Sequence, residues 1–456
     1  MAIFAPTYTS KLQSSFVRFD AEFFKPAFTE VYERICAIPG VYLLGKITER
    51  ITQGSNPRFT NKGLPCVNGK NVYFGTMTEG DPNFVSAVEF ERLSGYVLRR
   101  NDLVITLKHA TKIGRAWIVE DDEPRIFSRN VGLLRLKDDS PIIPSVLLLY
   151  LWTKQGQLLL DRCATGGTTG QITLPMSELR CLPIPPISED DQTAIDSLFW
   201  RSRRSIKKSI ESYIQAQQLL ESELGLDKLR FEKPVGYTAQ FSDLEMSHRN
   251  DAQHYQPRFT QLLEHLEQFP TKRVREVCLY NRRGIQPIYS DNGTHAVVNS
   301  QHLGEKHLNY DGLQKTTERA FNASPEAHIQ QDDLLIYTTG AYIGRTNVYL
   351  DDIPAFASNH VNILRLSPQI DHAYMAMVFQ SIVGQFQTQK YARGSAQAEL
   401  YPADINKFVI PLLPPEKQTK IGNLVRESLV KKRESSQLLE QAKARVEQLI
   451  EEAVQS

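Results

Sequence analysis

The chain has 456 residues, of which 41% are hydrophobic and 23% are charged, and its formal net charge is +1. This length fits two or three domains, and the composition is typical of a folded protein rather than a disordered one. The charge lacks the basic signature of a non-specific nucleic-acid coat, but it allows a basic patch on one face.

The spacing of the cysteines and the first residues of the chain argue against a zinc site, a disulfide framework and a signal peptide. A zinc site or disulfide framework needs repeated short spacings, which are missing among Cys36, Cys66, Cys163, Cys181 and Cys278. We therefore expect reduced, structural cysteines. The start of the chain lacks the layout of a signal peptide, and no apolar run approaches the length of a membrane span. We expect a cytoplasmic protein.

The chain repeats itself. Residues 18–29 read RFDAEFFKPAFT and residues 249–260 read RNDAQHYQPRFT, with identical residues at a constant offset of 231. Further pairs of similar segments follow in the same order along the chain: Gly54, Pro57 and Gly63 with Gly284, Pro287 and Gly293; 99–124 with 330–354; 128–136 with 358–366; and 179–195 with 406–421. Their number and order indicate a tandem duplication.

Each copy is predicted to contain a mixed α/β region followed by a long helix. The β-like runs of the first copy, separated by Gly- and Asn-rich turns, are 102–107, 116–119 and 131–136. Residues 145–160 are predicted to form a helix, which 373–389 mirrors. The pattern of predicted strands and helices ends at about 225–237, and we place a domain boundary there, before the second copy begins.

Two long helices are predicted after the Pro-Pro pairs 185–186 and 414–415. The first lacks proline and glycine over 189–224. Its predicted seam is Phe199, Ser202, Ile206, Ile210, Tyr213, Gln217, Leu220 and Leu224, at alternating steps of three and four. The second seam is Leu439, Ala442, Val446, Leu449 and Ala453, after a polar interruption at 431–436. We expect the helices to pack together as a coiled coil; packing of each on its own domain is the alternative.

The duplication, the Pro-Pro…Gln element that opens each long helix and the G-x-x-P…G…N pattern of each α/β region resemble the specificity subunit of type I restriction-modification enzymes. The resemblance extends from about Arg18 to the C-terminus and rests on the order of the motifs. It implies two target-recognition domains that each read half of a split DNA site, and two helical spacers in an antiparallel coiled coil. The implied division is target-recognition domain 1 at 1–188, spacer 1 at 189–230, target-recognition domain 2 at 231–414 and spacer 2 at 415–456.

The resemblance also implies partners. Besides double-stranded DNA, these are two methyltransferase subunits, which carry S-adenosylmethionine and dock on the spacers, and nuclease-translocase subunits, which use ATP and Mg²⁺. We expect this chain to hold no cofactor and no metal, and to have no membrane partner. Two rigid helices would hold two readers at a fixed separation better than a flexible linker does.

No catalytic residue is predicted. Residues 184–187 and 413–416 lack the amide and the aromatic residue of an amino-methyltransferase motif, and no phosphate-binding loop with its lysine occurs. The Gly-rich segment 164–170 is a DNA-facing loop or a structural turn. Paired acids at 121–122 and 351–352 suggest turn residues rather than a nuclease metal site.

Candidate DNA contacts are the long polar residues of the duplicated loops, because Arg, Lys, Asn and Gln read base edges while Ser and Thr hold phosphates. The first copy offers Gln53, Ser55, Asn56, Arg58, Lys62, Asn68, Lys70, Asn71, Lys108, Lys112, Arg115, Thr168, Thr169 and Gln171. The second copy offers Arg282, Arg283, Gln286, Asn299, Gln301, Tyr337, Thr338, Tyr342, Arg345, Arg393, Gln397 and Tyr401. Arg115 and Arg345 are the preferred pair, since each follows a glycine. The basic run 201–208 contacts the DNA backbone or only solvates its helix.

Two other functions stay open at this stage. One is the recognition subunit of a related system that cuts on both sides of its site or only methylates. The other is a coiled-coil scaffold without a nucleic-acid role, which would show no salt-dependent DNA binding. An enzyme is the least favoured class, because methyltransferase and nuclease motifs are both missing from the sequence.

Overall fold

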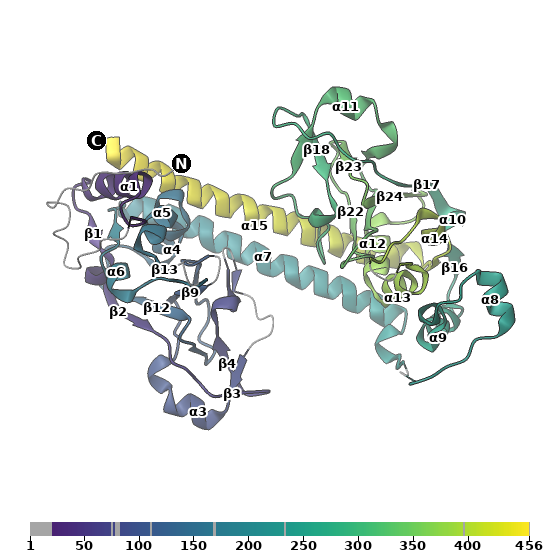
Figure 1. Ribbon diagram of the computed structural model, residues 1–456, viewed down its shortest axis with the longest axis horizontal. Helices are drawn as coiled ribbons and strands as arrows, with labels where there is room; N and C mark the ends of the chain where they lie inside the picture. Colours follow the sequence, from purple (N-terminus) through teal and green to yellow (C-terminus); the bar gives the residue numbers. More distant parts are fainter. Residues whose placement is uncertain are drawn as a thin grey trace. The chain divides into compact units, whose positions relative to one another are not determined.

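The computed structural model describes residues 21–73, 76–77, 83–109, 112–166, 170–231, 234–394 and 397–455 (Figure 1). The chain forms two compact units. Unit 1 comprises Met1–Arg204 and Ser435–Ser456, and unit 2 comprises Ser205–Glu434. Two long helices, α7 (Glu189–Glu223) and α15 (Pro415–Gln455), each contribute to both units. Among the described residues, no helix combines the length and apolarity that a bilayer crossing requires.

Unit 1 is built around an antiparallel sheet in the order β10-β8-β12-β2. Its strands are β2 (Thr48–Gln53), β8 (Leu103–Thr106), β10 (Ala116–Ile118) and β12 (Val131–Leu136). A second sheet, in the order β11-β4-β7-β3, consists of β3 (Phe59–Thr60), β4 (Leu64–Val67), β7 (Asn83–Val85) and β11 (Ile126–Phe127). The apolar strands β8 and β10 are buried along their whole length, so the first sheet lies in the core.

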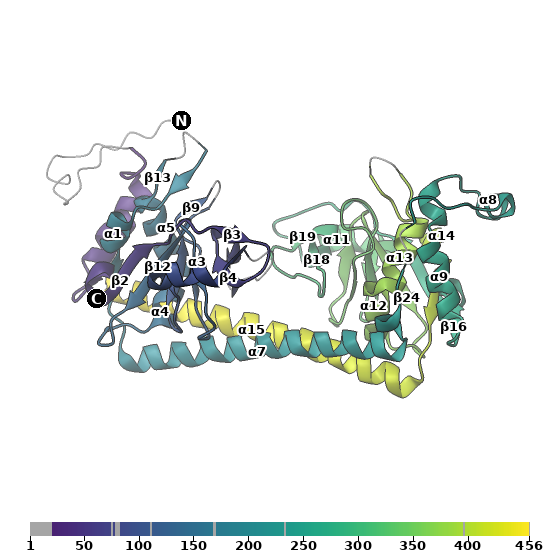
Figure 2. The ribbon, with the colours of Figure 1, turned by 90° about the horizontal axis from the view of Figure 1, so that it is seen from below.

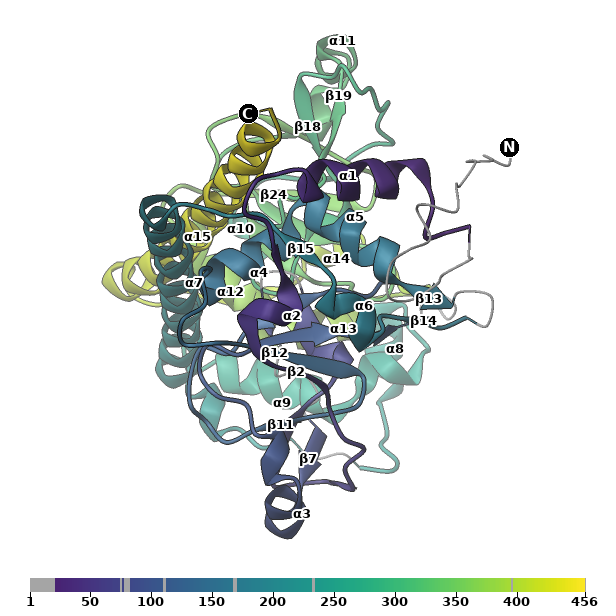
Figure 3. The ribbon, with the colours of Figure 1, turned by 90° about the vertical axis from the view of Figure 1, so that its left-hand side faces the viewer.

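The helices of unit 1 flank this sheet. They are α1 (Pro26–Cys36), α2 (Leu44–Ile47), α3 (Ala87–Arg92), α4 (Pro144–Trp152), α5 (Lys154–Cys163) and α6 (Met176–Arg180). The short strands are β1 (Tyr42–Leu43), β5 (Val72–Tyr73), β6 (Thr76–Met77), β9 (Lys108–His109), β13 (Thr165–Gly166), β14 (Ile172–Thr173) and β15 (Pro183–Ile184). α1 lies along α5, where the Arg162 guanidinium is 4.1 Å from the centre of the Tyr32 ring (Figure 3).

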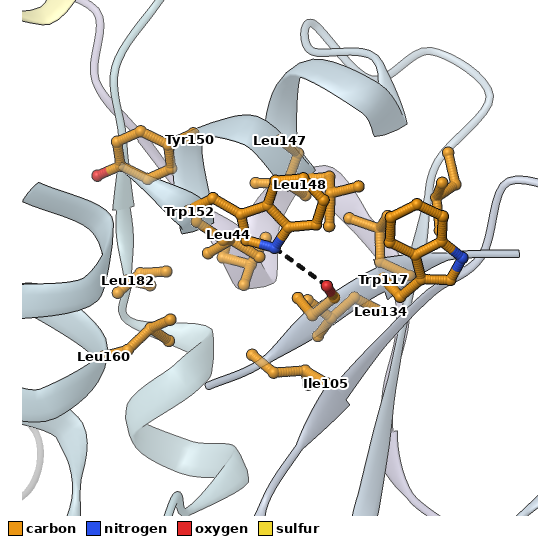
Figure 4. Packing of buried hydrophobic residues seen from close by; sticks show 14 of the residues in the cluster. Leu44, Ile105, Trp117, Leu134, Leu147, Leu148, Tyr150, Trp152, Leu160 and Leu182 are labelled. Atoms are coloured by element: carbon orange, nitrogen blue, oxygen red, sulfur yellow. Dashed lines mark hydrogen bonds between the residues drawn. The ribbon is translucent and has the colours of Figure 1, made fainter. Parts of the chain in front are cut away.

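Two tryptophans join helix and sheet in the core of unit 1. The rings of Trp117 on β10 and Trp152 on α4 stack with their centroids 5.8 Å apart. The indole Nε1 of Trp152 donates to the carbonyl of Ala116 at 3.0 Å (Figure 4). A buried indole N–H needs an acceptor, so this bond fixes how α4 packs on β10. α4 is apolar all round because it is buried on every side.

Unit 2 repeats this architecture with a sheet in the order β17-β24-β21-β22. Its strands are β17 (Cys278–Arg283), β21 (Leu334–Tyr337), β22 (Thr346–Val348) and β24 (Val361–Leu366). The second sheet, in the order β19-β18-β23-β20, consists of β18 (His295–Val298), β19 (Gln314–Thr316), β20 (His328–Ile329) and β23 (Ala355–Ala357). β18 and β23 pair in parallel, as β4 and β11 do in unit 1. The duplication is therefore present in the strand pairing as well as in the sequence.

Most of the remaining elements of unit 2 have counterparts among the described residues of unit 1. The helices are α8 (Phe241–Ser247), α9 (Pro257–Leu266), α10 (Val274–Val277), α11 (Glu318–Asn322), α12 (His372–Gln380), α13 (Ile382–Tyr391) and α14 (Pro402–Ile405). β16 (Thr271–Arg273) pairs with β25 (Val409–Pro411), as β1 pairs with β15. The apolar helix α12 corresponds to α4 and is buried from Ala373 to Phe379.

The repeated charged and polar residues make repeated structural contacts. Asp102, 2% exposed, accepts two hydrogen bonds at 2.7 Å from the Arg135 guanidinium. Asp333, fully buried, accepts two at 2.7 and 2.8 Å from Arg365. Buried carboxylates need such partners, so these pairs explain why the aspartate recurs before the β8 and β21 strands.

The Pro-Pro…Gln element is also structural. The side-chain oxygen of Gln192 accepts from the Ile143 amide at 2.9 Å, and that of Gln418 accepts from the Asp371 amide at 3.2 Å. Each glutamine also donates to a carbonyl of the extended run before its helix. The glutamines are 5% and 6% exposed. They tie the first turn of α7 to α4, and that of α15 to α12.

Within each unit, α7 and α15 lie side by side and run antiparallel (Figures 1 and 2). In unit 1, the Ser202 hydroxyl donates to the Ser435 carbonyl at 2.8 Å, and Arg445 lies 2.7 Å from the Asp191 carboxylate. In unit 2, the Ser209 hydroxyl donates to the carbonyl of Ser428 at 2.6 Å. The residue numbers fall on one helix as they rise on the other. The helices therefore pack on each other as well as on their own domains.

The contact residues of the helix pair agree with the predicted seam only in part. Five of its eight positions are buried: Phe199, Ser202, Tyr213, Leu220 and Leu224. Ile210 is 45% exposed, and Gln217 also faces solvent. Besides Ser202, which the seam includes, Ser205, Ser209 and Ser212 are buried on α7. Serines are small enough for close backbone approach, and the hydroxyls of Ser202, Ser209 and Ser212 bond to residues of α15. A pattern based on apolar residues gives no weight to the three other serines, which is why the prediction missed them.

On α15 the predicted seam is shifted by one residue at both ends. Leu438 and Ile450 are buried, whereas Leu439 and Leu449 are only partly buried. The predicted polar interruption is a contact region, because Ser435 is 6% exposed. Arg433 lies 2.6 Å from the Asp351 carboxylate of the same unit. The polar residues of the interruption therefore make contacts within their own units, Ser435 with Ser202 in unit 1, and Arg433 in unit 2.

Candidate nucleic-acid interface

The candidate contacts fall into four groups. Exposed members are Asn56, Arg58, Lys62, Lys70, Gln171, Arg282, Gln286, Gln301, Tyr342, Arg393, Gln397 and Tyr401. Half-buried members are Gln53, Ser55, Lys108, Lys112, Arg115, Arg283, Asn299, Tyr337 and Arg345. Buried members are Asn68, Asn71 and Thr338. Thr168 and Thr169 lie outside the described residues.

In unit 2, two arginines lie beside one exposed tyrosine. The Arg283 guanidinium, at the end of β17, is 4.7 Å from the centre of the Tyr401 ring, and that of Arg393 is 6.0 Å away. Tyr401 donates its hydroxyl to Glu399, and this bond raises the pKa of Tyr401 above its usual value. Arg393 also pairs with Asp404 at 3.0 Å. We define this as the Tyr401 cluster: Arg283, Arg393, Glu399, Tyr401 and Asp404.

Backbone pairing places this cluster beside the loop after β21. The amide of Leu400 donates to the Thr338 carbonyl at 2.9 Å, and the amide of Gly340 donates to the Ala398 carbonyl at 3.0 Å. Gly340 has φ +115°, and a Cβ there would lie 3.8 Å from the Gln397 amide nitrogen. The positive φ favours glycine, which lets the two loops approach. Gln397 and the Tyr401 cluster thus lie together at one end of the sheet.

The preferred arginine of unit 2 stacks on an aromatic ring. The Arg345 guanidinium is 3.7 Å from the centre of the Tyr342 ring, and Tyr342 contacts Tyr337 edge-on with centroids 6.4 Å apart. Gly344 has φ +87°, and a Cβ there would lie 2.7 Å from Thr388. The turn therefore requires glycine and directs Arg345 onto Tyr342, which is 55% exposed.

Unit 1 has the same backbone pairing with different side chains. The amide of Leu174 donates to the Leu107 carbonyl at 2.8 Å, which matches the bond from Leu400 to Thr338. Lys108 pairs with Thr173 across β9 and β14. Gln53, at the end of β2, donates its side-chain amide to the Arg129 carbonyl at 2.5 Å. Gln171 lies beside this ladder, just before β14.

The preferred arginine of unit 1 has other surroundings. Gly114 precedes it with φ +71°, like Gly344, and the Arg115 amide donates to the Thr106 hydroxyl at 3.0 Å. Arg115 is half-buried. Lys112 lies 3.7 Å from the Asp161 carboxylate. The duplicated turn is thus retained in both units.

Three candidates have structural roles that remove their side chains from a protein surface. The backbone amide of Asn68 donates to the side-chain oxygen of Asn71 at 2.9 Å in a capping turn. The hydroxyl of Thr338, which is fully buried, donates to the His360 carbonyl at 3.0 Å. Residue type alone carries no information on burial, so the sequence analysis could not separate these residues from exposed ones.

Arg203 of the basic run on α7 and Asp121 of the paired acids form contacts inside unit 1, whereas other members of the basic run are exposed. The Arg203 guanidinium is 4.4 Å from the centre of the Trp117 ring and 2.8 Å from the Glu120 carboxylate, so it packs inside unit 1. Asp121 lies 2.5 Å from Arg125. No group of three or more His, Cys, Asp or Glu side chains among the described residues has a metal-site arrangement.

Sequence reasoning missed the acidic members of the Tyr401 cluster. Asp404, 1% exposed, accepts from both Arg393 and Lys407. Glu399 accepts from Tyr401 and lies 4.0 Å from Arg283. The candidate contacts contained no acidic residue, yet here Glu399 and Asp404 pair with the arginines beside them. No local pattern marks them, because Arg283 lies far from both in the sequence.

Comparisons with known proteins agree with this architecture. Residues 267–432 match the family described as type I restriction modification DNA specificity domain. No curated protein sequence matches the chain. The chain is similar to the type I restriction-modification system S subunit from M. genitalium, with 14% identity over 91% of this chain and 96% of that one and a TM-score of 0.51. It is also similar to the HsdS subunit from Thermoanaerobacter tengcongensis, with 15% identity, 90% and 96% coverage and a TM-score of 0.29.

Proposed function

We propose that this chain, a DNA sequence specificity subunit that carries the type I restriction-modification DNA specificity domain, reads a bipartite target with one unit on each half. The observation that supports two half-sites is that the two units share their backbone pairing but carry different side chains at equivalent positions of the candidate interface. Gln53 and Arg283 occupy the same place at the end of β2 and β17. Thr165 and Arg393 likewise occupy the same place, opposite Thr173 and Glu399.

The exposed polar groups of unit 2 suit base recognition. Arg283, Arg345 and Arg393 hold guanidinium groups against tyrosine rings, which reduces the rotamer freedom that DNA binding would otherwise remove. A pre-oriented guanidinium presents two parallel donors, the geometry that recognises guanine in the major groove. In unit 1, Gln53 offers an amide at the corresponding place, and amides pair with adenine.

Specificity proteins of this family act with methyltransferase and restriction subunits. In our proposal this chain is non-catalytic, holds no cofactor and binds two methyltransferase subunits in the cytoplasm. S-adenosylmethionine would belong to the methyltransferase, and ATP and Mg²⁺ to the restriction subunit.

The long helices offer a docking surface for a methyltransferase. Ile210 and Ile214 lie one turn apart on α7 and are 45% and 42% exposed, and Val430 on α15 is 59% exposed. Burial of such exposed apolar side chains by a partner is favourable and would stabilise the complex. The double variant Ile210→Asp/Ile214→Asp should weaken methyltransferase binding at least tenfold (about 1.4 kcal/mol) in pull-down titrations. Leu279→Asp, at an exposed site on β17, is the control and should bind normally.

Methylome sequencing tests the bipartite reading directly. A host that expresses the chain with its methyltransferase should carry one methylated motif, with two specific half-sequences separated by a fixed gap. Arg283→Gln places the residue of unit 1 at its equivalent position in unit 2, and should alter one half-sequence only. Arg319→Gln, at an exposed site on α11, should leave the motif unchanged. Changes in both half-sequences from Arg283→Gln would contradict the assignment of one unit to each half.

A further inference from the structure

Unit 2 contains a polar cavity of about 540 Å³ beside the candidate interface. It lies among the segment 238–255, the C-terminal end of α13 and the residues around α10 and α14. Six cationic side chains line it: Arg249, Arg273, Arg275, Lys390, Arg393 and Lys407. Only two carboxylates, Asp243 and Asp404, line it with them. The cavity therefore has an excess of positive charge.

Part of this charge is neutralised within the protein. Arg249 forms a two-pronged pair with Asp251 at 2.5 and 2.8 Å and also donates to the Tyr391 carbonyl at 3.1 Å. Arg393 and Lys407 share the single carboxylate of Asp404, at 3.0 and 2.9 Å. Two cations on one carboxylate leave one positive charge unbalanced.

The other cations are not paired with carboxylates. Lys390 donates to the His254 carbonyl at 3.0 Å, and burial lowers the pKa of its ammonium group. Arg273 and Arg275 are exposed, and neither forms an ion pair among the described residues. Burial disfavours the charged form of the half-buried Lys390, so an anionic ligand would stabilise this side of the cavity.

The shared fold does not require this charge. The register of β1 with β15 and of β16 with β25 makes Leu43 the equivalent of Arg273. By the same alignment, Gly45 of unit 1 stands in place of Arg275, Thr165 in place of Arg393 and Cys181 in place of Lys407. The cations at these four positions are therefore found in unit 2 alone. Arg249 and Lys390, in contrast, correspond to cations of the first copy, Arg18 and Arg162.

We propose that the cavity binds a phosphate group of the DNA backbone next to the half-site that unit 2 reads. Arg393 belongs both to the cavity lining and to the Tyr401 cluster, so the cavity is continuous with the candidate interface. Unpaired arginines and lysines suit phosphate oxygens, and such contacts position a protein on DNA without reading sequence. The inference rests on the proposed function. Free phosphate offers the same chemistry, and the experiment separates the two sources.

The test uses the double variant Arg273→Ala/Arg275→Ala in the complex with the methyltransferase. Both side chains are exposed, so the fold should be retained. The matched control is Lys272→Ala, which removes an exposed cation from the same strand but outside the cavity lining. Affinity is measured for target DNA and for random DNA at several salt concentrations.

The double variant should bind both DNAs more weakly by the same factor, about five- to tenfold per lost phosphate contact at 0.1 M salt. The plot of log affinity against log salt concentration should become less steep by about 0.9 per contact. The methylated motif should not change. An affinity and slope equal to those of Lys272→Ala, or a loss confined to target DNA, would overturn the proposal.

Calorimetric titration of the lone chain with inorganic phosphate, at constant ionic strength, separates the two sources. Phosphate binding that the double variant abolishes, together with unchanged DNA affinity, would assign the cavity to free phosphate and overturn its assignment to DNA. If the unaltered complex shows no sequence preference, the proposed function fails. The salt slope for random DNA and the phosphate titration would still report on the cavity.

Discussion

Units 1 and 2 share the strand order of their central sheets and their buried polar contacts but differ at the ends of these sheets. Tyr150 and Tyr374 both donate their hydroxyls to a carbonyl of the run before a long helix, at 2.7 and 2.9 Å. The surface of unit 2, in contrast, carries two arginines beside Tyr401, where unit 1 has Gln53 and Thr165. Residues that recur in both copies mostly maintain the fold. If each unit reads a different half-site, the difference between the half-sites would come from residues that do not recur.

The largest expected effect is on the free energy of unfolding, when the buried aspartate is removed from either repeated Asp–Arg pair, Asp102–Arg135 or Asp333–Arg365. Asp102→Ala leaves Arg135, whose side chain is 11% exposed, without its partner. It should lower the free energy of unfolding by about 3 kcal/mol. Asp333→Ala should cost less, about 2 kcal/mol, because the Arg365 side chain is 26% exposed and can be hydrated. Urea denaturation measures both.

Exposed aspartates provide the controls for these two variants. Asp139→Ala in unit 1 and Asp352→Ala in unit 2 should each change the unfolding free energy by less than about 0.5 kcal/mol. If Asp102→Ala or Asp333→Ala proves as mild as its control, the two pairs do not have equivalent roles in holding the sheets.

An intermediate effect is expected from the preferred arginines. Arg115→Ala and Arg345→Ala should each weaken binding of the assembled complex by about 1–3 kcal/mol, the value of a lost two-pronged base contact. When the half-site that an arginine reads is scrambled, its alanine variant should bind as the unaltered complex does. The half-site concerned should be a different one for each variant. Arg345→Lys should behave like alanine, because lysine lacks the planar group that stacks on Tyr342. If both variants lost affinity at the same half-site, the two arginines would not have equivalent roles in the two units.

The smallest expected effect depends on pH and is specific to unit 2. His307 hydrogen-bonds the Ser428 hydroxyl of α15 at 2.7 Å, and burial, with Lys432, Lys306 and Arg433 nearby, lowers its pKa to about 3. A folded-state pKa below the unfolded value of 6.5 means that the unfolded chain takes up the proton first. Stability should therefore fall between pH 6.5 and 3, by up to about 1.4 kcal/mol per pH unit.

His307→Gln should remove this dependence while it retains a polar group beside Ser428. Unfolding free energies of both proteins at pH 7 and pH 5.5 provide the measurement, and the variant should lose about 1 kcal/mol less than the unaltered chain on acidification. Equal pH dependence in the variant would show that His307 is not the responsible group.

The duplication, the order of elements and the long helices could be predicted from the sequence, because they depend on local residue patterns that occur twice. The first long helix was expected over 189–224 and is found at Glu189–Glu223. The helix contacts were predicted only in part, since Ser202 makes one as expected, Ser209 makes one that was missed and Ile210 is exposed. The Tyr401 cluster could not be derived, because Arg283 and Glu399 are brought together only by the sheet.

The sharing of α15 between the units has a consequence for how the protein is made. Ala442, Val446 and Ile450 belong to the buried core of unit 1, although they follow all of unit 2 in the sequence. During synthesis, the unit that emerges first from the ribosome therefore stays incomplete until the last helix has been translated. A premature stop after residue 434 would expose this part of the core of unit 1 while every residue of unit 2 is present. Truncated chains would thus be removed by quality control before they could guide a partner to half a target.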